Sequence, residues 1–433
     1  MDLEVIQNVV CPFCGCCCDD IEVTIDSGKI TGVKNACAIG MTKFLHYGDE
    51  RNSSPMVRKN GELFKTTFDM AVEKTVEILT NAKYPILYGW SSTSCEAQKV
   101  GVELAEEVGG VIDNTSSVCH GPSIEAVQDI GESTCTFGEV KHRADLVVYW
   151  GCNPVQAHMR HLLRYSASCV GKFRKGRADR IIVVVDVRNS STAKLADHFI
   201  QIEPNQDYEF ISALRMAIRM EEIEQDSVAG VPVEKIEELA DILIGCQFGI
   251  IFFGLGLTMS AGKNRNIDAA LSLVRDLNSR TKFLIMPMRG HFNVTGANKV
   301  SAWQTGYPFA VDFSQGYPRY NPGDTSVIDI LNRGECDAAL IVASDPVAHF
   351  PQQAVKTLAS IPVIVIDPHL NATSLLAEVV IPSAFVGIEA EGIVYRMDGV
   401  PLILKKLVEP SNGIHSDEAI LRMILTQIRK RRG

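Results

Sequence analysis

Short apolar runs, each followed by small or Asx residues and then by helical periodicity, constrain the fold of this 433-residue chain most strongly. They recur from about residue 85 onward. Strands of a parallel sheet show this pattern because helices bury both of their faces. The predicted strands are Pro85–Tyr88, Asp145–Trp150, Ile181–Val185, Gly249–Phe253, Phe283–Met286, Ala338–Val342 and Pro362–Ile366.

Two helices are predicted from single stripes of apolar residues. One runs from Phe68 to Leu79. The other follows Thr93 and Glu96, which have the spacing of a capping box. Its stripe comprises Ala97, Val100, Leu104 and Val108. Strands that alternate with helices predict an α/β fold with doubly wound sheets.

The second half of the chain weakly repeats the first. The matching segments are 88–94 with 253–259, 147–158 with 340–350, and the stretches that start at 183 and 364. In each pair a strand ends in small or Asx residues, where exposed backbone N–H groups commonly bind a phosphate or nucleotide. The repeat therefore predicts two related nucleotide-binding lobes, and a purely structural duplication carries equal weight.

Charge and hydropathy exclude several classes of partner. The formal net charge of −10 offers no basic face for a phosphate backbone, so a nucleic-acid partner is not expected. No segment reaches the roughly 20 uninterrupted apolar residues of a membrane span, and no basic stretch precedes an apolar run at the start. We expect a cytoplasmic protein of two or three domains.

Thirteen cysteines in such a chain predict reduced thiols that serve metals or chemistry. Cys11, Cys14 and Cys18 have C-x2-C-x3-C spacing, and eighteen residues separate Cys18 from Cys37. Four thiolates, three of them close in sequence, suit a [4Fe–4S] cluster. A structural zinc site is the alternative, but a second C-x2-C pair is missing. Spacing does not decide which cysteine of the 16–18 run is the third ligand.

Further motifs follow the cysteine cluster in a fixed order. They are GELFKTTFDMAVEKTVEIL (61–79), SVCHGPS (117–123), GCNPVQAH (151–158), DVRNSSTA (186–193), RGHFNVTGANKVSAWQTGYP (289–308) and GIEAEGIVYRMDGVP (387–401). Together these residues resemble the molybdopterin-dependent oxidoreductase family, in particular its formate dehydrogenases. Each motif is weak, whereas their number and order are specific.

The resemblance implies roles for individual residues. Cys119 would ligate tungsten or molybdenum, and a soft thiolate suits either metal. His120 would exchange the proton that accompanies interconversion of CO2 and formate. Arg289 would hold formate through two hydrogen bonds. The residues implied for two molybdopterin guanine dinucleotides are Asn153, Asp186, Arg188, Asp345 and Asp367.

Two departures narrow the resemblance to the formylmethanofuran dehydrogenase family. The gap between Cys18 and Cys37 is shorter than in typical members of the family. The chain also ends before the barrel domain with which self-contained members cover the pterins. We expect another subunit to supply that domain. Further expected partners are a metal-hydrolase subunit, which would condense formate with methanofuran, and ferredoxin-like electron-transfer subunits. Where the family has a lysine between cluster and pterin, this chain has Ile39, and Lys43 or Lys65 could replace it.

The expected domains are an iron–sulfur domain at 1–55, a discontinuous first lobe at 56–135 and 325–433, and a second lobe at 136–324. Two other functions fit the same fold. A formate dehydrogenase subunit would share the metal site. A metal-free scaffold subunit would have no use for Cys119, His120 and Arg289 together.

Overall fold

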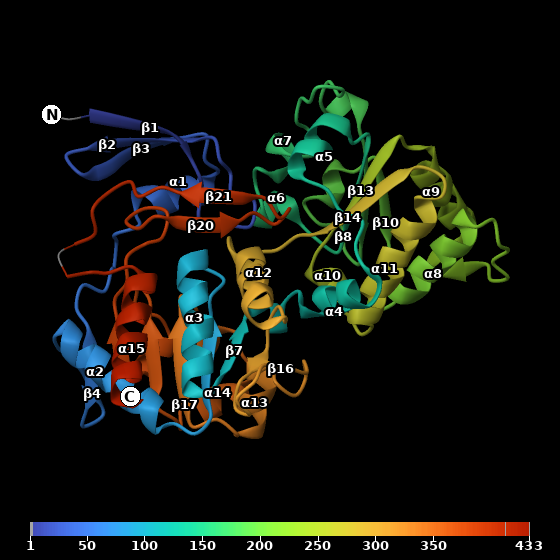
Figure 1. Cartoon of the computed structure of the whole chain (residues 1–433). Helices are drawn as coiled ribbons and strands as arrows, with labels where there is room; N and C mark the ends of the chain where they lie inside the picture. The colour runs from blue at the N-terminus through green and yellow to red at the C-terminus, as the bar shows by residue number, and fades with distance from the viewer. Residues whose placement is uncertain (1–2, 412, 433) are drawn as a thin grey trace. The chain divides into compact units, whose positions relative to one another are not determined.

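The computed structural model describes residues 3–411 and 413–432, which form two compact units (Figure 1). Unit 1 comprises Met1–Val118, His291–Arg396 and Pro401–Gly433. Unit 2 comprises Cys119–Gly290 and Met397–Val400. The N-terminal residues belong to unit 1 and do not form a unit of their own.

The units divide the chain at other points than the predicted domains. Residues 119–135 belong to unit 2, because they include helix α4 (Gly121–Ile130), which packs on α11 (Asn264–Leu277). Residues 291–324 belong to unit 1, because α12 (Val294–Thr305) packs on α3.

The main sheet of unit 1 has the order β16-β15-β7-β6-β17-β18-β19-β4-β5. Strands β7 to β19 in this order are parallel, and antiparallel pairs extend both edges. The chain adds β7 on one side of β6 and later β17, β18 and β19 on the other, as in a doubly wound sheet. The bounds are Met56–Lys59 for β4, Glu62–Lys65 for β5, Pro85–Gly89 for β6, Val111–Asn114 for β7, Val311–Asp312 for β15, Arg319–Tyr320 for β16, Ala338–Val342 for β17, Val363–Ile366 for β18 and Val379–Ile381 for β19.

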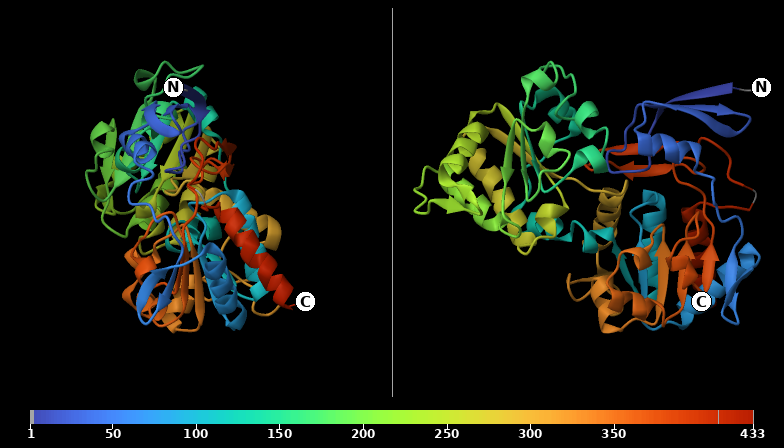
Figure 2. Two further views of the ribbon diagram at one scale, coloured as in Figure 1. Left: turned by 90° about the vertical axis from the view of Figure 1, so that its left-hand side faces the viewer. Right: turned by 180° about the vertical axis from the view of Figure 1, so that it is seen from behind.

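Helices cover both faces of this sheet. One apolar cluster joins one face to α2, α3 and α15, and a second joins the other face to α13 and α14. The red α15 lies beside α2 and α3 (Figures 1 and 2). Within β18, Ile364 and Ile366 belong to the first cluster and Val363 and Val365 to the second. The helix bounds are Phe68–Asn81 for α2, Cys95–Val108 for α3, Val327–Arg333 for α13, Gln352–Leu358 for α14 and Asp417–Arg432 for α15.

The sheet of unit 2 is parallel throughout and has the order β10-β9-β8-β13-β14. Helices α4, α8, α9 and α11 pack on one face. The predicted repeat pairs β8 with β17, β9 with β18 and β13 with β6, and both sheets arrange these strands in the same order. The bounds are Leu146–Trp150 for β8, Ile181–Asp186 for β9, His198–Gln201 for β10, Phe248–Phe253 for β13, Lys282–Pro287 for β14, Asp207–Ile218 for α8 and Val233–Gly245 for α9.

The α/β class and the seven predicted strands are confirmed, each strand to within one residue at either end. Both predicted helices form, but the predicted capping box is wrong. Ser94 is the N-cap of α3 and accepts a hydrogen bond from the Ala97 N–H at 3.3 Å. Thr93 instead donates to the buried carboxylate of Asp417 at 2.5 Å. An unsatisfied buried carboxylate would cost more free energy than an uncapped N–H at the start of the helix.

None of the described helices is long and apolar enough to cross a membrane. The remaining strands and α-helices lie outside the two main sheets and the helices named above. Strands β1, β2 and β3 form a small antiparallel sheet, and β20 pairs with β21. The bounds are Leu3–Val9 for β1, Ile21–Asp26 for β2, Lys29–Lys34 for β3, Ala38–Leu45 for α1, Phe137–Arg143 for α5, Pro154–Ala157 for α6, His161–Arg164 for α7, Ser227–Val228 for β11, Val231–Pro232 for β12, Leu255–Thr258 for α10, Gly392–Tyr395 for β20 and Pro401–Leu404 for β21.

Candidate functional site

The predicted cluster ligands lie together in unit 1. The loop between β1 and β2 closes where the Cys11 N–H donates to the Cys18 carbonyl at 2.9 Å. The thiol of Cys11 has Cys14, Cys18 and Cys37 as electrostatic neighbours, and burial is the main cause that raises its pKa well above the usual value. The N-cap thiol of Cys37 accepts from the Gly40 N–H at 3.3 Å.

The cysteines of the 16–18 run differ in their surroundings. The Cys17 thiol donates to the Phe292 carbonyl at 3.3 Å and packs in an apolar cluster with Val10 and Leu404. The Cys16 thiol donates to Cys14 and is the main cause that lowers the pKa of Cys14 to about 7. Cys17 is therefore a core residue. Within residues 3–411 and 413–432, no three His, Cys, Asp or Glu side chains form a ligand set for a single metal ion.

A cavity of about 480 Å³ lies beside this loop in unit 1. Its wall includes Pro12 and Phe13 of the loop and Lys43 of α1. The wall also includes residues that follow β17 and β18, among them Asp345 and Asp367. Two of the residues predicted to bind nucleotide thus line one cavity at the carboxyl edge of the sheet.

The structure separates the two candidate lysines. The Lys43 ammonium lies 5.4 Å from the centroid of the Phe13 ring and lines the cavity. Lys65 is exposed on the outermost strand β5, where it pairs with Met56. Only Lys43 of these two therefore lies beside both the cysteine loop and the cavity.

Two of the three carboxylates that line the cavity, Asp345 and Asp367, have different surroundings. Asp345 accepts hydrogen bonds from the N–H and hydroxyl of Thr373, at 2.9 and 2.6 Å, so it braces the next loop. Asp367 accepts from the His369 N–H at 2.9 Å. Burial, and to a smaller extent Asp417 and Asp345, raise the pKa of Asp367 to about 7.

Unit 2 repeats this arrangement at the end of β8. Asn153 accepts from the N–H and hydroxyl of Thr192, at 3.2 and 2.7 Å, as Asp345 does from Thr373. The backbone angles agree closely, with φ −127° and ψ 72° at Asn153 and φ −126° and ψ 72° at Asp345. Asp186 accepts from the N–H of Arg188 at 3.1 Å, and the Arg188 side chain is exposed. The repeat therefore extends to individual hydrogen bonds.

Cys119, His120 and Arg289 lie together in unit 2, immediately before α4 and after β14. Thr258 donates to the Cys119 carbonyl at 3.0 Å, which fixes the turn. Burial raises the pKa of the Cys119 thiol to about 11, and the nearby Arg289 cation opposes this rise. A cation beside a buried thiol favours its thiolate, which is the form that binds a metal.

His120 is fully buried, and both of its ring nitrogens have partners. Nδ1 lies 3.1 Å from the Ser123 hydroxyl, and Nε2 lies 3.2 Å from the Met288 carbonyl. A carbonyl only accepts, so Nε2 carries the hydrogen. Burial and then Arg289 lower the pKa of His120 to about 3, which keeps the ring neutral. His120 would take up a proton at Nδ1, and the Ser123 hydroxyl would first have to give up its hydrogen bond to that nitrogen.

Two further residues near Arg289 were not predicted. His158 donates from Nε2 to the Arg289 carbonyl at 2.9 Å. Burial raises the pKa of Glu132 to about 7, an effect that Arg289 opposes. The sequence signal for His158 was its place at the end of the GCNPVQAH motif, but nothing in that motif points to residue 289.

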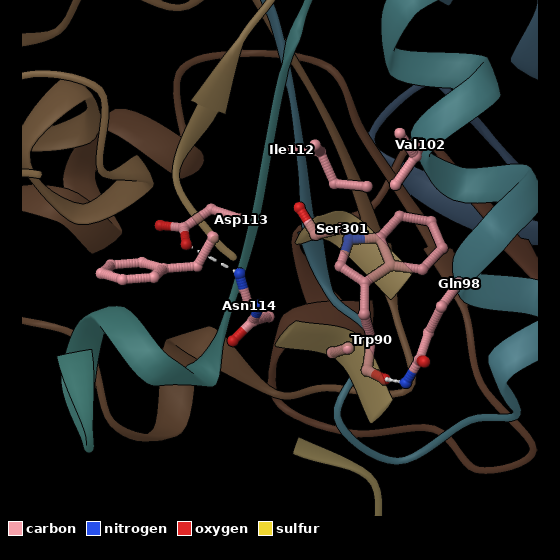
Figure 3. Close-up of a pocket in the computed structure, with 9 residues that line it drawn as sticks. Trp90, Gln98, Val102, Ile112, Asp113, Asn114 and Ser301 are labelled. Carbon is pink, nitrogen blue, oxygen red and sulfur yellow. Dashed lines mark hydrogen bonds between the residues drawn. The ribbon is translucent and has the colours of Figure 1, made fainter. Parts of the chain in front are cut away.

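Another hollow in unit 1 is too small for a ligand. It lies between Trp90, Val102 and Ile112, and Gln98 donates to the Trp90 carbonyl at 2.7 Å (Figure 3). Its volume of about 10 Å³ is that of one water molecule at most. Asp113 at its edge braces the fold by accepting from the N–H groups of Val327 and Asn114.

A family model for molybdopterin oxidoreductases matches residues 51–427, so the chain belongs to the molybdopterin oxidoreductase family. One subunit of the tungsten-containing formylmethanofuran dehydrogenase 2 of Methanocaldococcus jannaschii is 52% identical to the chain over 432 residues, which are 99% of each protein. The corresponding subunit of the enzyme of the same name from Methanococcus maripaludis is 51% identical and covers 98% of this chain and 99% of its own length.

A solved structure supports the fold independently. A chain of the formyltransferase/hydrolase complex from Methylorubrum extorquens superposes with a TM-score of 0.70 at 22% identity, over 84% of this chain and 97% of that one. The expected family and the likeness to formylmethanofuran dehydrogenase subunits are confirmed. The chain is therefore an oxidoreductase subunit of the formylmethanofuran dehydrogenase type.

Proposed function

We propose that the chain is the tungsten- or molybdenum-pterin catalytic subunit of a formylmethanofuran dehydrogenase complex, which reduces CO2 reversibly to formate. The observation that carries this proposal is the grouping of the Cys119 thiol, the buried His120 ring and the Arg289 cation at one edge of unit 2. The relatives at 51–52% identity support the choice of reaction.

The residues suit the cofactors that the family implies. Cys119 would hold the metal, and Cys11, Cys14, Cys18 and Cys37 would hold a [4Fe–4S] cluster. The cavity of about 480 Å³, with Asp345 and Asp367 in its wall, offers room for part of a large ligand. Asn153, Asp186 and Arg188 would serve a second pterin guanine dinucleotide in unit 2. When bound, the metal–pterin group supplies two-electron redox chemistry.

The protein residues bind and orient the small substrate. The Arg289 guanidinium would hold the formate carboxylate through paired hydrogen bonds, which a buried setting strengthens. His120 would accept or return the proton at Nδ1, while the Met288 carbonyl fixes the hydrogen on Nε2. Lys43 would place a positive charge between the cysteine loop and the cavity.

We further propose that the chain acts within a larger complex. Another subunit would cover the pterins, ferredoxin-like subunits would deliver electrons, and a metal-hydrolase subunit would condense formate with methanofuran. A formate dehydrogenase subunit is the nearest alternative, and the grouping of Cys119, His120 and Arg289 disfavours a metal-free scaffold subunit.

The test is a comparison of two cysteine variants in the anaerobically purified complex. Cys119→Ala is expected to reduce viologen-linked formate oxidation to background and to lower the tungsten or molybdenum content, while iron content is retained. Cys246→Ala is the matched control, because Cys246 is a partly buried thiol that donates to the Leu243 carbonyl. Turnover of formate by the Cys119→Ala complex would contradict the proposal.

A further inference from the structure

Two buried imidazoles hold the segment that carries Arg289. His120 donates from Nε2 to the Met288 carbonyl at 3.2 Å, and His158 donates from Nε2 to the Arg289 carbonyl at 2.9 Å. Both acceptors are carbonyl oxygens, so each Nε2 must carry the hydrogen. Consecutive carbonyls of one short segment are thus bound by side chains from two different loops.

This segment follows the end of β14. The Met288 N–H donates to the Phe253 carbonyl at 2.7 Å and continues the pairing of β14 with β13. Beyond it, Gly290 is exposed, and among the described residues no atom outside 289–291 lies within 4 Å of the position of a Cβ there. The His158 contact therefore lies at the point where the main chain leaves the sheet.

His158 is itself firmly placed. The residue is only 4% exposed, and its own N–H donates to the Pro154 carbonyl at 2.8 Å. Asn153, which directly precedes Pro154 at the start of this turn, accepts hydrogen bonds from Thr192. An imidazole on such a turn can fix the Arg289 main chain because it does not move with that segment.

We propose that His158 is a positioning residue, which sets the place of the Arg289 guanidinium through the Arg289 carbonyl. This inference rests on the proposed function, in which that guanidinium holds formate. A displacement of about 1 Å at a binding group lowers catalytic efficiency by up to roughly a hundredfold.

The experiment compares His158→Met with His158→Gln in the purified complex. Methionine fills the space but cannot donate, whereas the glutamine amide can donate to the carbonyl. We expect His158→Met to raise the KM for formate by about tenfold to a hundredfold, with unchanged tungsten or molybdenum content. His158→Gln is expected to recover most of that loss. His142→Met, at an exposed histidine of the same unit, is the control.

The crystal structure of the His158→Met complex gives a second readout, in which the Arg289 main chain and guanidinium should be displaced. An unchanged KM, a guanidinium in its original place, or a loss of activity in proportion to lost metal would each overturn the inference. If His158→Met does not assemble, His158→Asn replaces it, because its shorter amide cannot reach the carbonyl. Arg289→Lys separates the two proposals: an unchanged KM in that variant contradicts the role of Arg289 itself.

Discussion

Burial shifts the pKa of three ionisable side chains of the candidate site, Cys119, His120 and Asp367. It raises the pKa of Cys119 to about 11 and that of Asp367 to about 7, and it lowers the pKa of His120 to about 3. Each change favours the neutral form, because few water molecules reach these groups. Cofactors with charge of their own would change this balance when they bind.

Asp367 gives a prediction on pH. Its folded-state pKa of about 7 exceeds the usual value of 3.8, so the folded chain binds this proton more tightly than the unfolded chain. Its contribution to stability is present below about pH 4 and is lost as the pH rises through 7. Asp367→Asn, which keeps an acceptor for the His369 N–H, should therefore become more stable relative to the wild type as the pH rises.

Chemical denaturation of the purified chain between about pH 4 and pH 8 measures this effect, and the difference should change by at most about 1.4 kcal/mol per pH unit. Asp241→Asn, at an exposed carboxylate, is the control. A difference between Asp367→Asn and wild type that stays constant with pH would show that Asp367 ionises normally.

Local sequence predicted some residues of the candidate site and gave no signal for others. Cys119 and His120 are adjacent and lie in a recognisable motif, and Arg289 begins another motif. The contact of His158 with Arg289 joins residues 131 apart in sequence. It depends on how β8 and β14 are placed in the sheet, which spacing alone does not reveal.

At the scale of elements, continuous apolar runs predicted seven strands, because helices cover the faces of such strands. Strands β7 and β19 are also buried but were not predicted, because β7 ends in Asp113 and Asn114 and β19 has only three residues. Towards the edges of the unit 1 sheet, β4, β5 and β16 are short and partly exposed and β15 has only two residues, so their sequences lack that signal. The start of α3 shows a similar limit, because Thr93 and Ser94 are both good caps and the choice depends on the distant Asp417.

These two residues predict different losses of stability. Ser94→Ala removes the N-cap of α3 and should cost about 1 kcal/mol. Thr93→Val leaves the buried Asp417 carboxylate without that donor and should cost about 1–3 kcal/mol. Urea denaturation measures both, with the exposed Ser53→Ala as control. A larger loss for Ser94→Ala than for Thr93→Val would contradict the assigned roles.

At the scale of the whole molecule, unit 1 is built from separate stretches of the chain that an ion pair helps to join. The Arg51 guanidinium bonds to the Glu389 carboxylate, and both side chains are buried. Arg51 also donates to the Ser383 carbonyl at 2.9 Å, and Glu389 accepts from the Phe385 N–H at 2.9 Å. Glu389, in the segment GIEAEGIVYRMDGVP (387–401), therefore has a structural role.

Removal of one partner of this pair should be costly. Arg51→Met leaves a buried carboxylate unpaired and is expected to lower the free energy of unfolding by about 3–5 kcal/mol. The double variant Arg51→Met with Glu389→Leu should lose less, because no isolated charge remains. Glu77→Ala, which breaks the exposed pair with Lys74, should cost less than about 1 kcal/mol. Additive losses in the double variant would refute this coupling.

In the sequence, the long segment of unit 2 lies between β7 and β17, and this order affects how the protein folds while it is translated. Strand β6 pairs with β17 in the finished sheet, yet all of Cys119–Gly290 is translated between them. At about 5–20 residues per second, β6 waits roughly ten to fifty seconds for this neighbour after it leaves the ribosome. The sheet of unit 2 can close during that interval. The edge of β6 that later pairs with β17 therefore stays unpaired until β17 has been made.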